Sequence, residues 1–228
     1  NTSISLSADI DFGGAQLGPI GNATTSFSGT FDGGKHVISN VKILGTVDDD
    51  NMGFIGYGSA TSKLSNLILS GITVNGGFKV GGAAGYTEGT IERVAVQGTS
   101  LVESKLNSGG TNVGGIAGQL YKPGVIDQCK VGDSVIVRDT QANASYIGGI
   151  AGQVNGINGT PGEFATVQNS YSQASVTSGA GTVGGIVGYL NHGKILGSYF
   201  AGVSNHSGGN ASEGGILGSY ANLTAMTD

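Results

Sequence analysis

One short phrase returns six times along the chain and limits what the chain can fold into. Each copy begins and ends with glycine and holds two apolar residues between: Gly53–Gly56, Gly82–Gly85, Gly115–Gly118, Gly149–Gly152, Gly185–Gly188 and Gly215–Gly218. Successive copies begin 29, 33, 34, 36 and 30 residues apart. A period between about 20 and 50 residues is typical of solenoids, propellers and other repeat arrays.

A second phrase follows the first five copies, and one more copy precedes them: Ile38–Ile43, Leu64–Leu69, Ile91–Val96, Ile126–Val131, Val167–Ser172 and Ile195–Phe200. Its last four residues alternate between the two faces of a strand. Its first apolar residue, however, stands an odd three positions before the next one. This offset predicts a bend at a position held by Asn40, Asn66 and Asn169, because asparagine tolerates left-handed backbone.

A third, weaker strand closes several units, at 72–74, 100–102, 134–137 and 175–177. Stacked coils would pair each strand with its equivalents about 4.8 Å away, so each unit buries a face that it could not bury alone. The expected fold is therefore all-β: a parallel β-helix or β-solenoid of about six glycine-rich coils, right-handed, with three short strands per coil. Glycine would allow tight corners with positive φ and close approach of neighbouring backbones.

Composition narrows the class of protein further. The chain has 45 glycines but only three prolines, and 38% of its residues are hydrophobic, which argues against collagen, a linker or disorder. A net charge of −5 with scattered basic residues argues against nucleic-acid binding, and no apolar run is long enough for membrane insertion. The single cysteine, Cys129, excludes an intramolecular disulfide and falls in an inward-facing column of the second phrase.

The glycine phrases resemble the GLUG repeat, and the opening segments 8–12, 18–21 and 27–38 resemble the region that precedes such repeats. GLUG repeats occur in large bacterial surface proteins, including filamentous-haemagglutinin-like adhesins and the non-catalytic parts of IgA-cleaving peptidases. The resemblance implies export to the bacterial cell surface and carries no catalytic residues. We expect 1–228 to be one β-solenoid segment of a larger protein, with leader or capping coils at 1–51 and repeats at 52–228.

Two groups of residues are candidates for a binding site. Tyr57, Tyr86 and Tyr189 each follow a glycine phrase and would form either a structural ladder or a strip that contacts a ligand such as a sugar. The run Asp48, Asp49 and Asp50 is the densest acidic cluster, but it lacks the spacing of a calcium loop. We therefore predict no metal and no cofactor, and retain these aspartates only as a weak metal candidate.

The longer repeats place their extra residues in the turn-rich segments 106–110, 121–124 and 155–162, where specificity would reside on such a scaffold. The sequence contains neither HExxH nor GxSxG. We expect a non-catalytic adhesive or spacer module that contacts a host-surface protein, a glycan or another copy of itself. The alternative is a carbohydrate-active β-helix, a lyase or glycosidase, with acids such as Glu92 and Asp127 acting across a groove. Calcium-dependent or ice-related binding is a weaker alternative.

Overall fold

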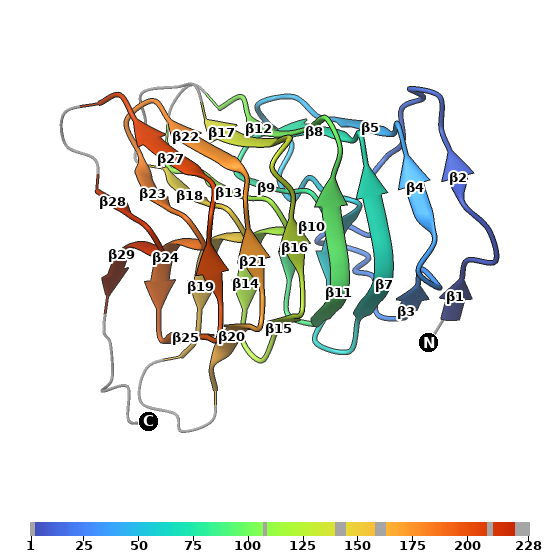
Figure 1. The fold of residues 1–228 in the computed structure, drawn as a ribbon. Helices are drawn as coiled ribbons and strands as arrows, with labels where there is room; N and C mark the ends of the chain where they lie inside the picture. The colour runs from blue at the N-terminus through green and yellow to red at the C-terminus, as the bar shows by residue number, and fades with distance from the viewer. Residues whose placement is uncertain (1–2, 107–108, 140–144, 158–162, 209–211, 222–228) are drawn as a thin grey trace.

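The computed structural model describes residues 3–106, 109–139, 145–157, 163–208 and 212–221. In this part of the chain all regular structure is β-strand, and the strands form four sheets that run side by side along the molecule (Figure 1). Every strand pairing is parallel, as the stacking of equivalent coils requires. The all-β solenoid expected from the sequence is confirmed. Within these residues there is no helix that could cross a membrane.

Sheet A is the largest and has twelve strands: β1 (Ser3–Ser5), β2 (Ile10–Asp11), β3 (Thr30–Asp32), β4 (Val37–Ser39), β7 (Lys63–Ser70), β11 (Thr90–Gln97), β15 (Val125–Asp127), β16 (Lys130–Val131), β20 (Ala165–Gln168), β21 (Tyr171–Ser172), β25 (Gly193–Leu196) and β26 (Tyr199–Phe200). Sheet B has six: β5 (Lys42–Leu44), β8 (Thr73–Gly76), β12 (Ser100–Ser104), β17 (Val135–Asp139), β22 (Ser175–Ser178) and β27 (Val203–His206).

Sheet D has five strands: β9 (Lys79–Gly81), β13 (Asn112–Gly114), β18 (Tyr146–Gly148), β23 (Thr182–Gly184) and β28 (Glu213–Gly214). Sheet C has six: β6 (Ile55–Gly58), β10 (Ala84–Thr87), β14 (Ala117–Tyr121), β19 (Ala151–Asn155), β24 (Val187–Asn191) and β29 (Leu217–Ala221). The chain visits the sheets in the order A, B, D, C and then returns to sheet A one coil further on.

A full coil thus contributes strands to four sheets, and the expectation of three strands was wrong; in the last three coils the sheet A segment is divided into two strands. The strand that the sequence did not reveal lies in sheet D, where two or three residues ending in glycine precede the second to sixth glycine phrases. Such a short segment shows too little alternation to stand out from the turn that follows it. The glycine phrase itself is a corner: β9 ends at Gly81, the chain turns through Gly82 and Ala83, and β10 begins at Ala84.

The core is a set of columns in which equivalent apolar residues of successive coils lie over one another. One column follows the second residue of the glycine phrase: Ile116 N–H donates to Ile150 O at 2.9 Å, and Ile150 N–H donates to Ile186 O at 2.9 Å. All three side chains are fully buried. Because each side chain packs on its counterparts above and below, no coil has a core of its own.

The glycines at the corners let the backbones of neighbouring coils come very close together. A Cβ atom added to Gly115 would overlap the carbonyl oxygen of Gly149, and one added to Gly149 would overlap that of Gly185. Neither glycine has positive φ. At this corner glycine is therefore needed for close approach and not for a left-handed turn.

Turns of variable length emerge at two places on the coil, between sheets B and D and between sheets C and A (Figure 1). The extra residues predicted at 106–110 lie at the first place, and those at 121–124 and 155–162 lie at the second. Residues 107–108 and 158–162 lie outside the described residues. Among the described residues, the variable turns therefore lie along two lines that are parallel to the stacking direction.

Candidate functional site

A row of bent residues crosses the outer face of sheet A. The predicted bend is confirmed, because Asn40, Asn66 and Asn169 have φ values of 55°, 52° and 48°. The same position is left-handed in the remaining copies of the second phrase, at Arg93, Gln128 and Gly197. The bend reverses the alternation, so that both apolar residues flanking it face the core.

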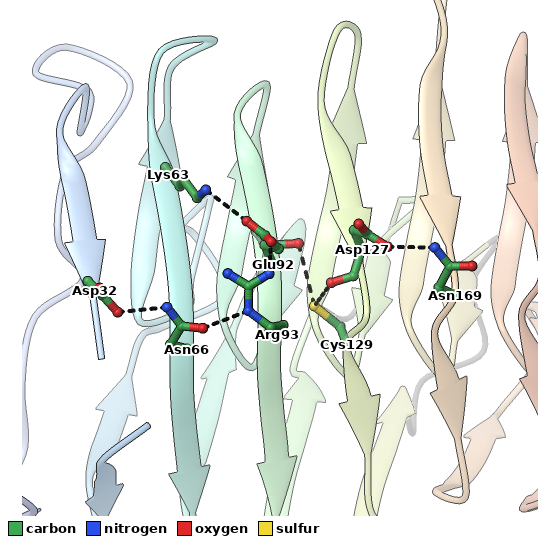
Figure 2. A network of polar contacts seen from close by, with 9 residues as sticks. Asp32, Lys63, Asn66, Glu92, Arg93, Asp127, Cys129 and Asn169 are labelled. Carbon is green, nitrogen blue, oxygen red and sulfur yellow. Dashed lines mark hydrogen bonds and ion pairs between the residues drawn. The ribbon is translucent and has the colours of Figure 1, made fainter. Parts of the chain in front are cut away.

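Side chains at the bend bond to the neighbouring coil (Figure 2). Asn66 Nδ2 donates to Asp32 Oδ1 at 2.9 Å, and Arg93 Nε donates to Asn66 Oδ1 at 2.7 Å. Further along the sheet, Asn169 Nδ2 donates to Asp127 Oδ1 at 2.9 Å. The row thus joins successive coils through side chains, in addition to the backbone ladder.

Gln128 offers a test of this geometry, because an L-residue with a side chain costs about 1–2 kcal/mol in left-handed backbone. We expect Gln128→Gly to raise the free energy of unfolding by about 1 kcal/mol, since φ is 54° at this position and Gly197 already occupies the equivalent place. Urea denaturation of both proteins measures the difference. A loss of stability would contradict the conformational argument. Gln97→Gly, in the regular part of β11, is the control and should destabilise.

The two acids of the enzymatic alternative lie on this face. Glu92 and Asp127 are register partners on the adjacent strands β11 and β15. Glu92 forms ion pairs with Lys63, at 2.7 Å, and with Arg93 (Figure 2). The two carboxylates are therefore neighbours on one sheet and not on opposite walls of a groove, and both are already engaged by neighbouring side chains.

The tyrosines that follow the glycine phrase lie in one column of sheet C but do not form a continuous ladder. Tyr57 and Tyr86 stack with ring centroids 4.4 Å apart. The next two positions of the column are Gln119 and Gln153, which separate this pair from Tyr189. The sequence spacing correctly placed the three tyrosines in one column. Glutamine in both coils between Tyr86 and Tyr189 interrupts the stacking of the rings.

Tyr189 instead stacks on Tyr146, a residue of the unpredicted strand β18, at 4.4 Å between centroids. The hydroxyls of the first pair meet at an acid: Tyr86 donates to Glu88 Oε1 at 2.9 Å, and Tyr57 lies 3.4 Å from the same oxygen. Burial raises the pKa of both Tyr57 and Tyr86. Because the ring faces cover one another, these pairs present ring edges and hydroxyl groups to a ligand.

Cys129 lies in the inward column that the alignment predicted, with 1% of its surface exposed. Burial raises the pKa of its thiol to about 12. The next two coils carry serine here, and the Ser170 hydroxyl accepts the Cys129 N–H at 3.0 Å while donating to Gln168 O at 2.7 Å. Hydroxyl groups can therefore replace apolar side chains in this column. Backbone N–H and C=O groups next to the bend serve as their hydrogen-bond partners.

We expect the Cys129 thiol to react with a disulfide reagent only after unfolding. The thiolate is the reactive form, and the raised pKa keeps Cys129 protonated in the folded protein at neutral and mildly alkaline pH. Absorbance of the released thiol at pH 8, with and without guanidinium chloride, measures this difference. Rapid reaction of the folded protein would contradict the buried position. A Ser3→Cys variant, which places a thiol on an exposed residue, is the positive control.

The acidic run at 48–50 forms a turn. Asp49 Oδ2 accepts the Thr46 N–H at 2.7 Å and the Thr46 hydroxyl at 2.9 Å. These bonds lower the pKa of Asp49. Among the described residues, no three His, Cys, Asp or Glu side chains are grouped so that they could hold a metal ion.

Aspartates also accept backbone N–H groups in the first coils of the solenoid. Asp9 Oδ1 accepts the Val37 N–H at 3.0 Å, and Asp32 Oδ1 accepts the Gly34 N–H at 3.0 Å. These backbone hydrogen bonds are the main reason that the pKa values of Asp9 and Asp32 lie below 3.8. The carboxylate form is thus favoured by folding.

A group with a lowered folded pKa stabilises the fold fully above its unfolded value, and the effect is lost as pH falls through the folded value. We therefore expect thermal stability to decline as pH drops below about 4. Circular dichroism melting between pH 7 and pH 2 tests this. Asp32→Asn should melt lower at pH 7 and show a flatter decline. Equal slopes for the two proteins would contradict the assignment.

One polar cluster was not predicted from the sequence. Asp139, Thr111 and Ser145 are all buried at the corner between sheets B and D. Thr111 Oγ1 lies 3.1 Å from Asp139 Oδ2 and 2.9 Å from Ser145 Oγ, and the Ser145 hydroxyl donates to the same carboxylate oxygen. The sequence does contain one sign of this cluster. Ser104 and Ser178, the register partners of Asp139 on the adjacent strands, are also small and polar.

Comparisons with known proteins add one sequence relative and one related structure. Halomucin from Haloquadratum walsbyi is 35% identical over 130 residues, which cover 52% of this chain. The chain spans about 1% of the length of that relative. The crystal structure of "a putative immunoglobulin A1 protease" from Bacteroides ovatus has a TM-score of 0.64 and covers 96% of this chain and 77% of that one, at 20% identity.

The likeness to the Bacteroides ovatus protein is one of fold. No family model matches the chain. The GLUG resemblance therefore rests on the repeated phrases themselves.

Proposed function

We propose that this chain is a rigid, non-catalytic module of an exported surface protein, in which stacked GLUG-type coils give reach and an outer face contacts a partner. The observation that carries the proposal is that the polar side chains on the outer face of sheet A bond to one another between coils. Glu92, Asp127 and the residues at the bend bond to neighbouring coils, so the acids that an enzymatic role would need serve to hold the array together.

The comparisons support an extracellular setting. Halomucin is a surface-associated protein, and the Bacteroides ovatus protein carries the name "a putative immunoglobulin A1 protease". The GLUG resemblance points to the bacterial cell surface as the location. The partner would be a host-surface protein, a glycan or another copy of the chain.

The tyrosine pair beside Glu88 is the contact surface that we favour for a glycan. Two phenol hydroxyls and a carboxylate within 3.4 Å offer both donors and acceptors to sugar hydroxyls. The partly exposed rims of Tyr57 and Tyr86 add apolar surface beside them.

Binding of the purified chain to glycan arrays and to matrix proteins tests the proposal, and mass spectrometry of the bound material tests whether it is altered. We expect binding without cleavage, weakened at least tenfold by Glu88→Gln. Tyr199→Phe, on the distant outer face of sheet A, is the matched control. Cleavage of any bound glycan would overturn the non-catalytic role, and unchanged binding by Glu88→Gln would overturn the assigned surface.

A further inference from the structure

Five successive coils each carry a tyrosine on sheet C or on the adjoining edge of sheet D. These tyrosines are Tyr57 on β6, Tyr86 on β10, Tyr121 at the end of β14, Tyr146 at the start of β18 and Tyr189 on β24. All five side chains are partly exposed. The Tyr86 ring stacks between Tyr57 and Tyr121, at 4.4 and 6.3 Å between centroids, and Tyr146 stacks on Tyr189. A phenol group is thus repeated at an interval of one coil.

Carboxamide groups occupy the column in the two coils where it has no tyrosine. Gln119 and Gln153 are successive register partners between Tyr86 and Tyr189. Gln153 Oε1 accepts from Asn112 Nδ2 at 2.8 Å, which orients the carboxamide across the boundary between sheets C and D. Phenol and carboxamide groups both donate and accept hydrogen bonds. We call the five tyrosines and the two glutamines the sheet C strip.

The sheet C strip lies inside the array and is bounded by described coils on both sides. Ser219 is the register partner of Tyr189 in the next coil. In the preceding coil Phe27 bridges Gly58, which places Ser26 at the equivalent position of the column. The limits of the strip are therefore set by residues within the stacked coils. From its first coil to its fifth it extends about 19 Å, at about 4.8 Å per coil.

The repeat of the sheet C strip fits a polysaccharide better than a peptide. Because the stacked ring faces cover one another, the strip presents hydroxyl and amide groups at intervals of about 4.8 Å. An extended peptide advances by about 3.3 Å per residue and would lose register with the strip within two coils. A pyranose unit in an extended, equatorially linked chain is close in length to the rise of one coil, and each unit brings hydroxyl groups of its own.

Charge narrows the class of glycan. None of the seven side chains of the strip is charged at neutral pH. The charged groups beside it are already engaged, since Glu88 accepts from the Tyr86 hydroxyl and Lys122 is paired with Glu163. A sulfated or uronic acid polymer would find no unpaired cation among these groups, so the strip complements an uncharged chain.

We propose that the sheet C strip binds an uncharged, equatorially linked polysaccharide that lies extended along the stacking direction, with about one sugar unit per coil over five coils. This inference rests on the proposed glycan contact, in which Tyr57 and Tyr86 become the first two of five subsites. The hydroxyl groups of each sugar unit exchange hydrogen bonds with the phenol or carboxamide group of one coil.

Isothermal titration calorimetry of the whole chain with β-1,4-linked glucose oligosaccharides of two to six units tests the proposal. We expect affinity to rise at least tenfold from the disaccharide to the pentasaccharide, because each added unit reaches another coil, and to change by less than about twofold for the hexasaccharide. Gln153→Ala, in the fourth coil of the strip, should weaken the pentasaccharide about tenfold and leave the disaccharide within about twofold.

Gln168→Ala is the matched control, because Gln168 is also partly exposed but lies on the outer face of sheet A. It should leave both affinities unchanged. Circular dichroism melting of each variant establishes that folded proteins are compared. Equal weakening by Gln153→Ala and Gln168→Ala would remove the binding site from sheet C.

The remaining outcomes separate this inference from the proposed function. Equal affinity for the disaccharide and the pentasaccharide would keep the contact at Tyr57 and Tyr86 and overturn the extended strip. If no oligosaccharide bound while another glycan on the array did so through Glu88, the strip would be wrong and the proposed glycan contact would stand. Absence of any glycan binding would overturn both. A matrix protein whose binding is lost in Gln153→Ala, with no sugar bound, would replace the polysaccharide by a protein partner.

Discussion

Gly149→Ala is expected to lower the free energy of unfolding by about 3 kcal/mol or more, because overpacking at this corner meets backbone and cannot be relieved by a change of rotamer. The added Cβ would overlap the carbonyl oxygen of Gly185 in the next coil and would lie 2.5 Å from Ser172 Oγ. Relief requires the two coils to separate, which would break the strand pairing of β19 with β24. Guanidinium chloride denaturation followed by circular dichroism measures the loss.

Gly215→Ala is the matched control for this prediction. Gly215 occupies the same place in the repeat, but a Cβ built there has no atom within 4 Å. We expect a change within about 0.5 kcal/mol. Similar losses in the two variants would mean that glycine serves backbone conformation at this corner, and the close-approach explanation would then be wrong.

Replacing Asp139 with alanine is expected to cost about 2–4 kcal/mol, because it removes a buried carboxylate that accepts from hydroxyl groups of two different segments. Thr111 and Ser145 are 0% exposed, so no bulk water replaces the lost acceptor. Together the three residues fix the corner between sheets B and D and join β17, β13 and β18. Thermal and denaturant unfolding measure the effect.

Asp133→Ala is the control for Asp139→Ala. Asp133 also accepts a serine hydroxyl, from Ser134 at 3.1 Å, but the pair is exposed. Its loss should change stability by less than about 0.5 kcal/mol. Asp139→Asn, which keeps one acceptor oxygen, should fall between the two. If Asp133→Ala and Asp139→Ala behaved alike, burial of the cluster would not be what makes it stabilising.

The two large predicted losses of stability, for Gly149→Ala and Asp139→Ala, both lie at corners of the coil. Strand pairing and apolar columns repeat in every coil, so removing one contact leaves many equivalents intact. At the Gly149 corner an added side chain meets backbone, and at Asp139 a buried acceptor is lost, so neither change can be absorbed by the movement of a side chain. The predicted sensitivity of Gly149 and Asp139 follows from this difference.

Particular residues show where prediction from the sequence succeeded. The odd offset in the second phrase predicted left-handed backbone at Asn40, Asn66 and Asn169, because alternation with period two cannot otherwise keep both apolar residues inside. The same alignment placed Cys129 in the core. Both inferences depend on local geometry repeated at a fixed interval, which a single sequence displays directly.

Other features could not be found in this way. The sheet D strands are three residues or shorter, and pairing with neighbouring coils, not local pattern, makes them strands. Tyr146 stacks on Tyr189 although Tyr146 lies in sheet D and Tyr189 in sheet C, so the two residues occupy different positions of the repeat. The neighbouring positions of Glu92 and Asp127 likewise depend on the register between β11 and β15.

The sequence by itself determined the period, the parallel stacking of coils, the position of the bends and the inward columns, because each of these follows from which residues recur at which spacing. Only the tertiary structure decided the number of strands per coil, the partners of the outward side chains and the buried cluster around Asp139. The physical reason is that contacts between coils depend on register and on the path of the corners, which couple residues about thirty positions apart.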